Sequence, residues 1–306
     1  MELGILGWGA LFVVSLAVLL KASDLFSGAA EKIGLSLGVS PFVIGVTVVA
    51  FGTSLPELAS SIVAVLDGES AIVSGNVIGS NVANVCLVLG IVAIVAGGIK
   101  MDFSVLDIDT PILFTSALLL WVFTRDGSVS ALDGLLLSGM LVVFLLNSFR
   151  SRGAEAAEEV AAGWRSYFLL VAGGVGVYYG ARYVVEGIQE LSAAFGISSA
   201  AIAMSVVALG TSLPEVFVSV AAARQGKPAM AVGNVVGSNI FNSFGVMGIP
   251  AFFGEVSVPL ENLAFSLPFM IGITVLFCLF ATASNVSRWE GVTLLGLYVI
   301  FLVELF

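Results

Sequence analysis

The same polar hexapeptide, Gly-Thr-Ser-Leu-Pro-Glu, occurs twice in this chain, each time inside a long apolar stretch. The first copy is Gly52–Glu57, and the second, Gly210–Glu215, follows 158 residues later. Hydroxyl and carboxylate groups are costly to place in an apolar environment, and proline interrupts a helix. We therefore expect two related halves that bring both hexapeptides together at the centre of the fold.

The composition indicates an integral membrane protein. Of the 306 residues, 59% are hydrophobic and only 10% are charged, whereas a soluble domain carries roughly 25% charged residues. The net charge of −10 includes no basic cluster that would indicate nucleic-acid binding, and there is no histidine. The two cysteines, Cys86 and Cys278, lie in apolar runs and are expected to be core residues, so no cofactor is predicted.

The apolar segments predict ten transmembrane helices and an all-α integral membrane protein. A bilayer core of ~30 Å requires about 20 apolar residues per helix. The N-terminal run is expected to be the first of these helices, not a signal peptide. The predicted segments are residues 4–28, 40–66, 71–96, 107–124, 132–149, 164–190, 198–223, 229–253, 263–282 and 289–305.

The two halves of the chain are sequence repeats. Gly45–Ile91 aligns with Ala203–Ile249 without a gap, and 23 of the 47 positions are identical. The longest polar connection, Arg150–Gly163, lies between the halves. With five helices in each half, the second repeat enters the membrane from the opposite side, which is typical of secondary transporters. We expect repeats at residues 1–153 and 154–306 within one compact membrane domain that functions as a monomer.

The distribution of basic residues predicts that both termini lie outside the cell membrane. With this orientation, nine lysines and arginines fall in cytoplasmic connections and two in outer ones, in agreement with the positive-inside rule. The nine are Lys21, Lys32, Lys100, Arg150, Arg152, Arg165, Arg224, Lys227 and Arg288, and the two are Arg125 and Arg182.

The hexapeptides have the chemistry of a hard-cation site. Pro56 and Pro214 lack an N–H, so each leaves backbone oxygens free within a membrane helix. Threonine and serine hydroxyls and a glutamate add oxygen ligands, which Na⁺ and Ca²⁺ prefer. Polar residues in membrane helices also form kinks and helix contacts. However, a glutamate at mid-membrane usually marks an ion path, and Glu57 is repeated as Glu215.

A second repeated motif follows each hexapeptide, at Gly75–Asn84 and at Gly233–Asn242. Its glycines, four residues apart, favour close helix packing. Ser80 and Asn84 share one helix face, as do their counterparts Ser238 and Asn242, and these oxygens are expected to face the glutamates. The remaining amides are expected to support broken backbone in the neighbouring helix; they are Asn76, Asn81, Asn234 and Asn239.

The two motifs together resemble the alpha repeats of the sodium/calcium exchanger branch of the cation/calcium exchanger superfamily. The likeness extends over nearly the whole chain. It implies exchange of Na⁺ for Ca²⁺ by alternating access, with two long tilted helices, 4–28 and 164–190, as sliding gates. It also implies Ca²⁺ coordination by Glu57 and Glu215 with backbone oxygens of Thr53 and Thr211. The flanking Na⁺ sites that it implies use Ala50, Ser54 and Ser80 in one half and Ala208, Ser212 and Ser238 in the other.

The chain departs from that family pattern at one position. Many members, including potassium-dependent ones, have an aspartate where this chain has Asn242, and here Asn84 and Asn242 are both amides. This difference argues against K⁺ transport and leaves the role of the middle site open.

Other functions remain as alternatives. A proton-coupled Ca²⁺ antiporter would use two carboxylates that share a proton, although that branch typically has a G-N-x-x-E pattern. A cation channel usually builds its pore from a ring of subunits, whereas this chain contains an internal two-fold repeat. The sequence contains no pairing of a nucleophile with a base, so it gives no indication of an enzyme. The expected partners are therefore Na⁺, Ca²⁺ and the lipid bilayer.

Overall fold

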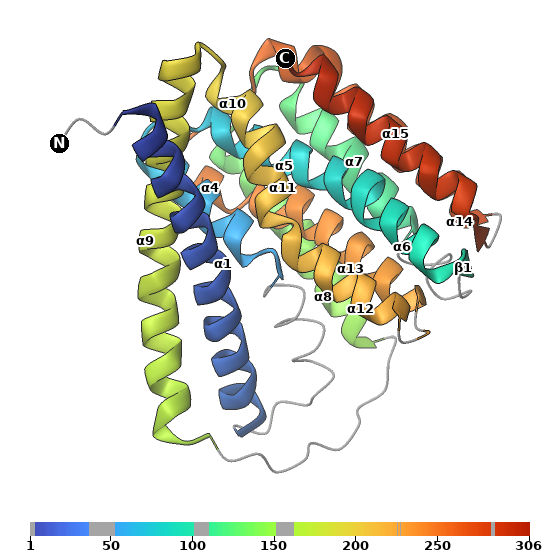
Figure 1. Ribbon diagram of the computed structural model, residues 1–306, viewed down its shortest axis with the longest axis horizontal. Coiled ribbons are helices and arrows are strands. Elements are labelled where there is room, and N and C mark those ends of the chain that lie inside the picture. The colour runs from blue at the N-terminus through green and yellow to red at the C-terminus, as the bar shows by residue number, and fades with distance from the viewer. Residues whose placement is uncertain are drawn as a thin grey trace.

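The computed structural model describes helices over most of the chain (Figure 1). The second half of the predicted segment 40–66 is described, whereas its first half, including Ala50, lies outside the described residues. The boundary between the predicted repeats, at residue 153, also lies outside them. The described residues are 4–36, 53–100, 110–150, 162–224, 226, 228–282 and 285–306.

Within these residues, six helical stretches are long and apolar enough to cross a membrane. Such helices satisfy their own backbone hydrogen bonds, which hydrocarbon cannot do. Three shorter apolar helices, Leu55–Leu66, Thr110–Thr124 and Ala131–Asn147, accompany them. The six long stretches are Ile5–Ser36, Ala71–Ala96, Trp164–Phe195, Ser199–Arg224, Ala231–Phe252 and Asn262–Thr282.

Helical structure occurs in all ten predicted segments. In the first half the helices are α1 (Ile5–Ser36), α4 (Leu55–Leu66), α5 (Ala71–Val82), the π-helix η2 (Ala83–Val88), α6 (Leu89–Ala96), α7 (Thr110–Thr124) and α8 (Ala131–Arg150). In the second half they are α9 (Trp164–Phe195), α10 (Ser199–Ile202), η4 (Ala203–Val207), α11 (Ala208–Thr211), α12 (Leu213–Arg224), α13 (Pro228–Phe241), η5 (Asn242–Val246), η6 (Pro250–Phe252), η7 (Asn262–Ser266), α14 (Leu267–Thr282) and α15 (Arg288–Glu304).

The two longest helices, α1 and α9, pack side by side and run in opposite directions (Figure 1). Both are longer than predicted, because α1 continues to Ser36 and α9 to Phe195. Glycines of α9 allow the close approach: a Cβ atom at Gly180 would lie 2.8 Å from the Cα atom of Leu19 in α1. Small residues at such contacts are the usual basis of helix association in membranes.

Helix α5 passes through the centre of the molecule and packs against α10, η4 and α11. All its residues from Ile72 to Val82 are buried. Gly75 and Gly79 make the contact possible, because a Cβ atom at either position would overlap the backbone of Ala200 or Met204. The first copy of the glycine pair therefore has the packing role that its spacing predicts. The second copy does not, because a Cβ atom at Gly233 or Gly237 would meet nothing within 4 Å.

Four short strands, which the all-α prediction missed, connect the two halves of the chain. Strand β1 (Ile99–Lys100) pairs antiparallel with β4 (Asn285–Val286), and β2 (Ser128–Val129) pairs antiparallel with β3 (Val256–Ser257). Each ladder thus joins a connection of the first half to a connection of the second. The two-residue strands lie in polar connections, where no alternating pattern marks them.

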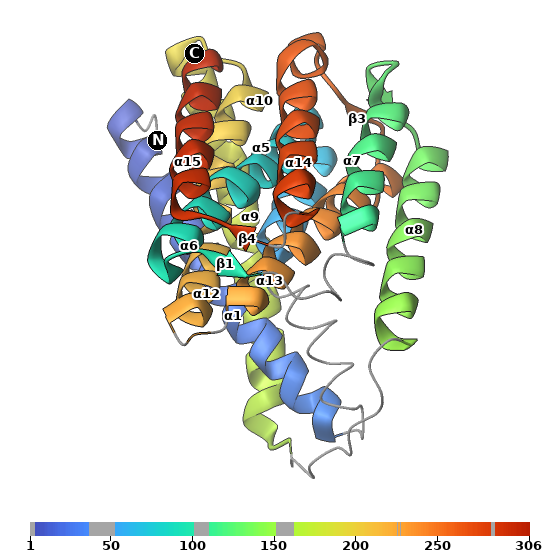
Figure 2. The same ribbon diagram turned by 90° about the vertical axis from the view of Figure 1, so that its right-hand side faces the viewer.

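The outer helices present apolar side chains outward. Leu6 of α1, Phe168 of α9 and Val303 of α15 are each more than 60% exposed, as expected for side chains that contact lipid. Helix α1 begins and α15 ends toward the same end of the molecule, whereas α9 begins at the opposite end (Figures 1 and 2).

Candidate cation site

The serine of each hexapeptide lies immediately before a helix. In the first, Ser54 caps α4 with φ −94° and ψ 8°, and Pro56 lies in the first turn, where its missing N–H costs least. In the second, Ser212 has nearly the same conformation, with φ −81° and ψ 2°, and separates α11 from α12. The repeated sequence therefore starts a helix at the same position in both halves, and each carboxylate lies in the first turn of that helix.

The two glutamates belong to one buried centre. Glu57 and Glu215 are each 1% exposed, and no other acidic or basic residue is buried among the side chains that the structure describes. Each interacts with the opposite half: Glu57 with the Thr211 side chain, and Glu215 with that of Thr53. Two like charges in a low dielectric repel strongly unless a cation or proton compensates them.

Several oxygens in this centre have no hydrogen-bond partner. They are Oε2 of Glu57 and of Glu215, and Oγ of Ser54 and of Ser212. Buried polar atoms are almost always satisfied, so a set of unpaired oxygens indicates room for a ligand. In the described part of the chain, no three His, Cys, Asp or Glu residues form a metal-binding group. A cation here would therefore need hydroxyl or backbone oxygens besides the two carboxylates, as hard cations commonly do.

The asparagines of the second motif support the hexapeptides from a neighbouring helix. Asn76 donates to the backbone carbonyl of Glu57 over 3.2 Å and to Oγ of Ser61 over 3.2 Å. Its counterpart Asn234 donates to Oγ of Ser219 over 3.1 Å, which reproduces the second bond in the other half. Asn76 therefore binds backbone of the neighbouring helix as predicted, but at a carbonyl within α4 and not at one freed by Pro56. Asn234 binds a side chain.

The serines and the remaining asparagines of this motif differ between the halves. Ser238 lies 3.4 Å from Oε1 of Glu215, whereas Ser80 donates to Oδ1 of Asn76 over 3.5 Å. Asn84 donates to Oδ1 of Asn239 over 3.0 Å, and both polar atoms of Asn242 are unpartnered. The expected face of serine and asparagine oxygens is therefore buried in both halves, but its hydrogen bonds are not symmetric.

Sequence reasoning missed several buried serines around the motifs. Ser60 donates to the carbonyl of Pro56 over 2.8 Å, and Ser61 and Ser219 accept the asparagine amides. The repeat carried a signal for these acceptors, because Ser61 and Ser219 are identical at the fixed spacing of the alignment. Ala208, a predicted site residue, is fully buried at the start of α11.

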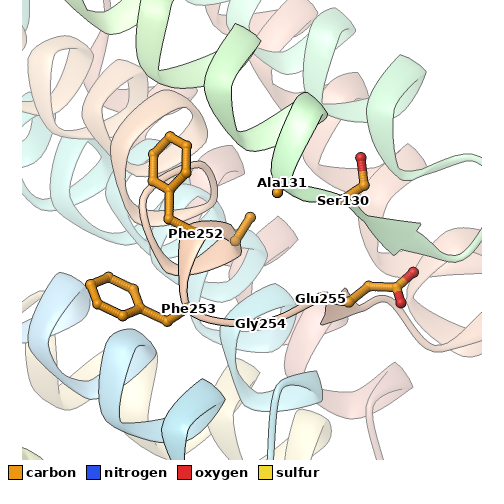
Figure 3. Close-up of a pocket in the computed structure, with 7 residues that line it drawn as sticks. Ser130, Ala131, Phe252, Phe253, Gly254 and Glu255 are labelled. Atoms are coloured by element: carbon orange, nitrogen blue, oxygen red, sulfur yellow. The ribbon is translucent and has the colours of Figure 1, made fainter.

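Two surface hollows lie apart from this centre. One, of about 430 Å³, is lined by Phe252, Phe253, Glu255 and residues near Ser130 (Figure 3). The phenylalanines are half exposed, and Glu255 supplies the single carboxylate. The other, of about 330 Å³, lies between the end of α4 at Asp67 and the last turns of α9. Neither hollow combines buried acidic groups with unpaired oxygens, so the buried centre is the better cation site.

Long apolar helices around an acidic, oxygen-rich centre define a multi-pass membrane protein suited to handling cations. The family model for sodium/calcium exchanger protein matches residues 8–150 and, again, residues 165–306. The chain belongs to this family.

Similar proteins share nearly the full length of the chain. The sodium/calcium exchanger MaX1 of Methanosarcina acetivorans is 37% identical over 97% of both chains. The uncharacterized membrane protein MJ0091 of Methanocaldococcus jannaschii is 36% identical over 98% of both. A solved structure of the sodium-calcium exchanger NCX_Mj, soaked with Na⁺ and Sr²⁺, is 33% identical, covers 98% of this chain and 99% of its own, and superposes with a TM-score of 0.70.

Proposed function

We propose that this protein exchanges Na⁺ for Ca²⁺ across the cell membrane by alternating access, without K⁺. The observation that carries the proposal is the pairing of Glu57 and Glu215, each of which interacts with a threonine of the opposite half. Ca²⁺ neutralises two carboxylates, and so do several Na⁺ ions in adjoining sites. The occupied states can then interconvert, whereas an empty, doubly charged centre is strongly disfavoured in low dielectric.

We place the proposed ligands around the glutamates. Thr53 and Thr211 would contribute oxygens to Ca²⁺ beside the two carboxylates, and Ser54 and Ser212 carry unpaired hydroxyls suited to Na⁺. The buried position of Ser238 beside Glu215 supports its place in the same set. The other proposed ion-site residues are Ala50, Ala208, Ser80, Asn84 and Asn242.

The independence from K⁺ is inferred from charge. Asn242 is buried and neutral where potassium-dependent relatives have an aspartate, so the centre carries at most two negative charges. Ca²⁺ alone balances them. A K⁺ ion added beside it would leave an uncompensated positive charge in a buried site, which is costly.

For the architecture we propose ten transmembrane helices in two inverted five-helix repeats, with both termini outside. Three observations support it: the family model matches each half separately, α1 begins and α15 ends toward the same end of the molecule, and α1 and α9 run in opposite directions. The unit that carries out exchange is proposed to be a monomer, because both hexapeptides come from one chain.

The deciding experiment measures ⁴⁵Ca²⁺ uptake into proteoliposomes loaded with Na⁺, with K⁺ or with acidic buffer. We expect uptake only with an outward Na⁺ gradient, and the same rate with and without K⁺ on the Ca²⁺ side. An absolute requirement for K⁺ would contradict the proposal. Uptake driven by a pH gradient without Na⁺ would instead identify a proton antiporter, and single-channel currents in a bilayer would identify a channel.

A further inference from the structure

Four asparagines lie at the contact between the two repeats, and their hydrogen bonds break the internal symmetry. In the fixed alignment of the halves, Asn81 corresponds to Asn239 and Asn84 to Asn242. All four are at least 97% buried. They lie at the ends of α5 and α13 and the starts of the π-helices η2 and η5, a type of distortion that is frequent at functional sites.

Two hydrogen bonds connect the halves, although Oδ1 of Asn84 accepts none. Asn84 donates to Oδ1 of Asn239 over 3.0 Å, and Asn239 donates to the backbone carbonyl of Asn81 over 3.3 Å. The symmetry-related bonds would run from Asn242 to Oδ1 of Asn81 and from Asn81 to the carbonyl of Asn239. The structure contains neither: Nδ2 of Asn242 and Oδ1 of Asn81, the donor and acceptor of the first, are both buried without a partner.

One serine accounts for the asymmetry. Asn81 donates to Oγ of Ser243 over 3.0 Å and lies 3.6 Å from the sulfur of Met270. The residue that corresponds to Ser243 in the first half is Val85, which is fully buried and has no acceptor. In the symmetry-related arrangement Asn239 would turn toward Val85 and find no partner there, and an unsatisfied buried amide is costly.

We propose that these four asparagines are a two-position switch between the two access states, and that Ser243 biases it toward the arrangement seen here. The inference rests on the alternating access proposed above. Alternating access moves one repeat or bundle against the other. In this proposal the internal two-fold relates the two states, so the mirrored set of bonds forms when Asn81 leaves Ser243. Ser243 is thus a positioning residue that acts through Asn81. Val85, which corresponds to it in the first half, has no side-chain group that could accept a hydrogen bond.

The test compares three variants in proteoliposomes with the wild type. Ser243→Ala removes the acceptor of the present arrangement, and Val85→Thr, which is nearly isosteric, supplies one to the mirrored arrangement. Both are expected to shift the ratio of the two access states in the same direction. The shift should be about three- to tenfold for each variant, which is the effect of one net hydrogen bond. Ser243→Thr keeps the hydroxyl and is expected to retain the wild-type ratio.

Two readouts make the result decisive. A shifted state ratio raises the half-saturating Ca²⁺ concentration at one membrane face and lowers it at the other. Hydrogen–deuterium exchange of α1 and α4 in ion-free protein reports the same shift without transport, so it remains informative even if Na⁺-driven exchange fails. Parallel changes at both faces, opposite effects of Ser243→Ala and Val85→Thr, or an unchanged ratio in Val85→Thr with normal thermal stability would overturn the switch.

Discussion

The side-chain amide of Asn76 lies 3.2 Å from the backbone carbonyl of Glu57, and this bond joins the two repeated motifs within the first half of the chain. The same amide also reaches Oγ of Ser60 and of Ser61. It therefore holds the turn from which the Glu57 carboxylate projects into the buried centre.

Asn76→Ala is expected to lower the free energy of unfolding by about 1–3 kcal/mol, because it removes the donor to the buried Ser61 hydroxyl and one of two side-chain donors to the Glu57 carbonyl. Thermal unfolding in detergent measures the change. Asn234→Ala is the matched variant and should cost less, because Asn234 has one described acceptor, Ser219, where Asn76 has three. An equal or larger loss in Asn234→Ala would contradict this account.

Glu57→Gln and Glu215→Gln are each expected to reduce Ca²⁺ flux by at least 10–100-fold, since a charge-assisted ligand contributes about 1.5–3 kcal/mol. The glutamine side chain is isosteric, so the protein should still insert and fold. Flux into Na⁺-loaded proteoliposomes measures the effect. Asp126→Asn, which removes an exposed carboxylate, serves as the control and should retain flux. Wild-type flux in either glutamine variant would reject the site.

Asn242→Asp is expected to change ion selectivity, because it adds a third negative charge to a centre that Ca²⁺ alone neutralises. The measurement is Ca²⁺ flux as a function of Na⁺ and K⁺ on both sides of the vesicle. We expect K⁺ to raise flux in the variant and to leave the wild type unchanged. An identical dependence on every ion would make Asn242 a structural residue.

Both termini are expected on the outer side of the cell membrane, not on the cytoplasmic side. With Cys278 replaced by alanine, a cysteine at Glu2 should react with a membrane-impermeant maleimide applied to intact cells. A cysteine at Arg224, in a connection assigned to the cytoplasm, should react only after permeabilisation. Reversed labelling of the two positions would invert the proposed topology.

Gly75→Ala is expected to destabilise the protein by about 1–3 kcal/mol, the usual cost of overpacking. The new Cβ atom would overlap the backbone carbonyl of Ala200, which cannot move aside as a side chain can. Thermal unfolding measures the loss. Gly139→Ala, in an exposed part of α8 with nothing within 4 Å, should be neutral or slightly stabilising. Equal stability of the two variants would show that α5 has room to shift.

Much of the fold followed from the sequence, because apolar length and a repeated motif are strong signals for membrane helices. The breaks at Ser54 and Ser212 were also predictable, since proline cannot continue a helix ladder. The C-terminal ends of α1 and α9, at Ser36 and Phe195, could not be predicted. Helix continues there into more polar connections, and hydropathy reports where lipid ends, not where helix ends.

In the candidate site, too, the sequence predicts some features and not others. Its carboxylates and hydroxyls could be identified because each recurs at a fixed spacing, as Ser61 and Ser219 also do. The asymmetric bonds of Asn84 and Ser243 could not, because a repeat alignment predicts equivalence between the halves. Those bonds depend on which of two nearly equal arrangements the packed protein adopts, and that choice is made by contacts across the whole interface.

The interdigitated halves have a consequence for biosynthesis. Glu57 is made long before its partner Thr211, and strand β1 long before β4, the last strand of the chain. A nascent chain that has completed only its first half therefore holds a buried carboxylate, unpaired amides and open strand edges with nothing to complete them. The buried centre can assemble only after α11, α12 and α13 have been made. The first half therefore stays in the bilayer with an incomplete centre until then.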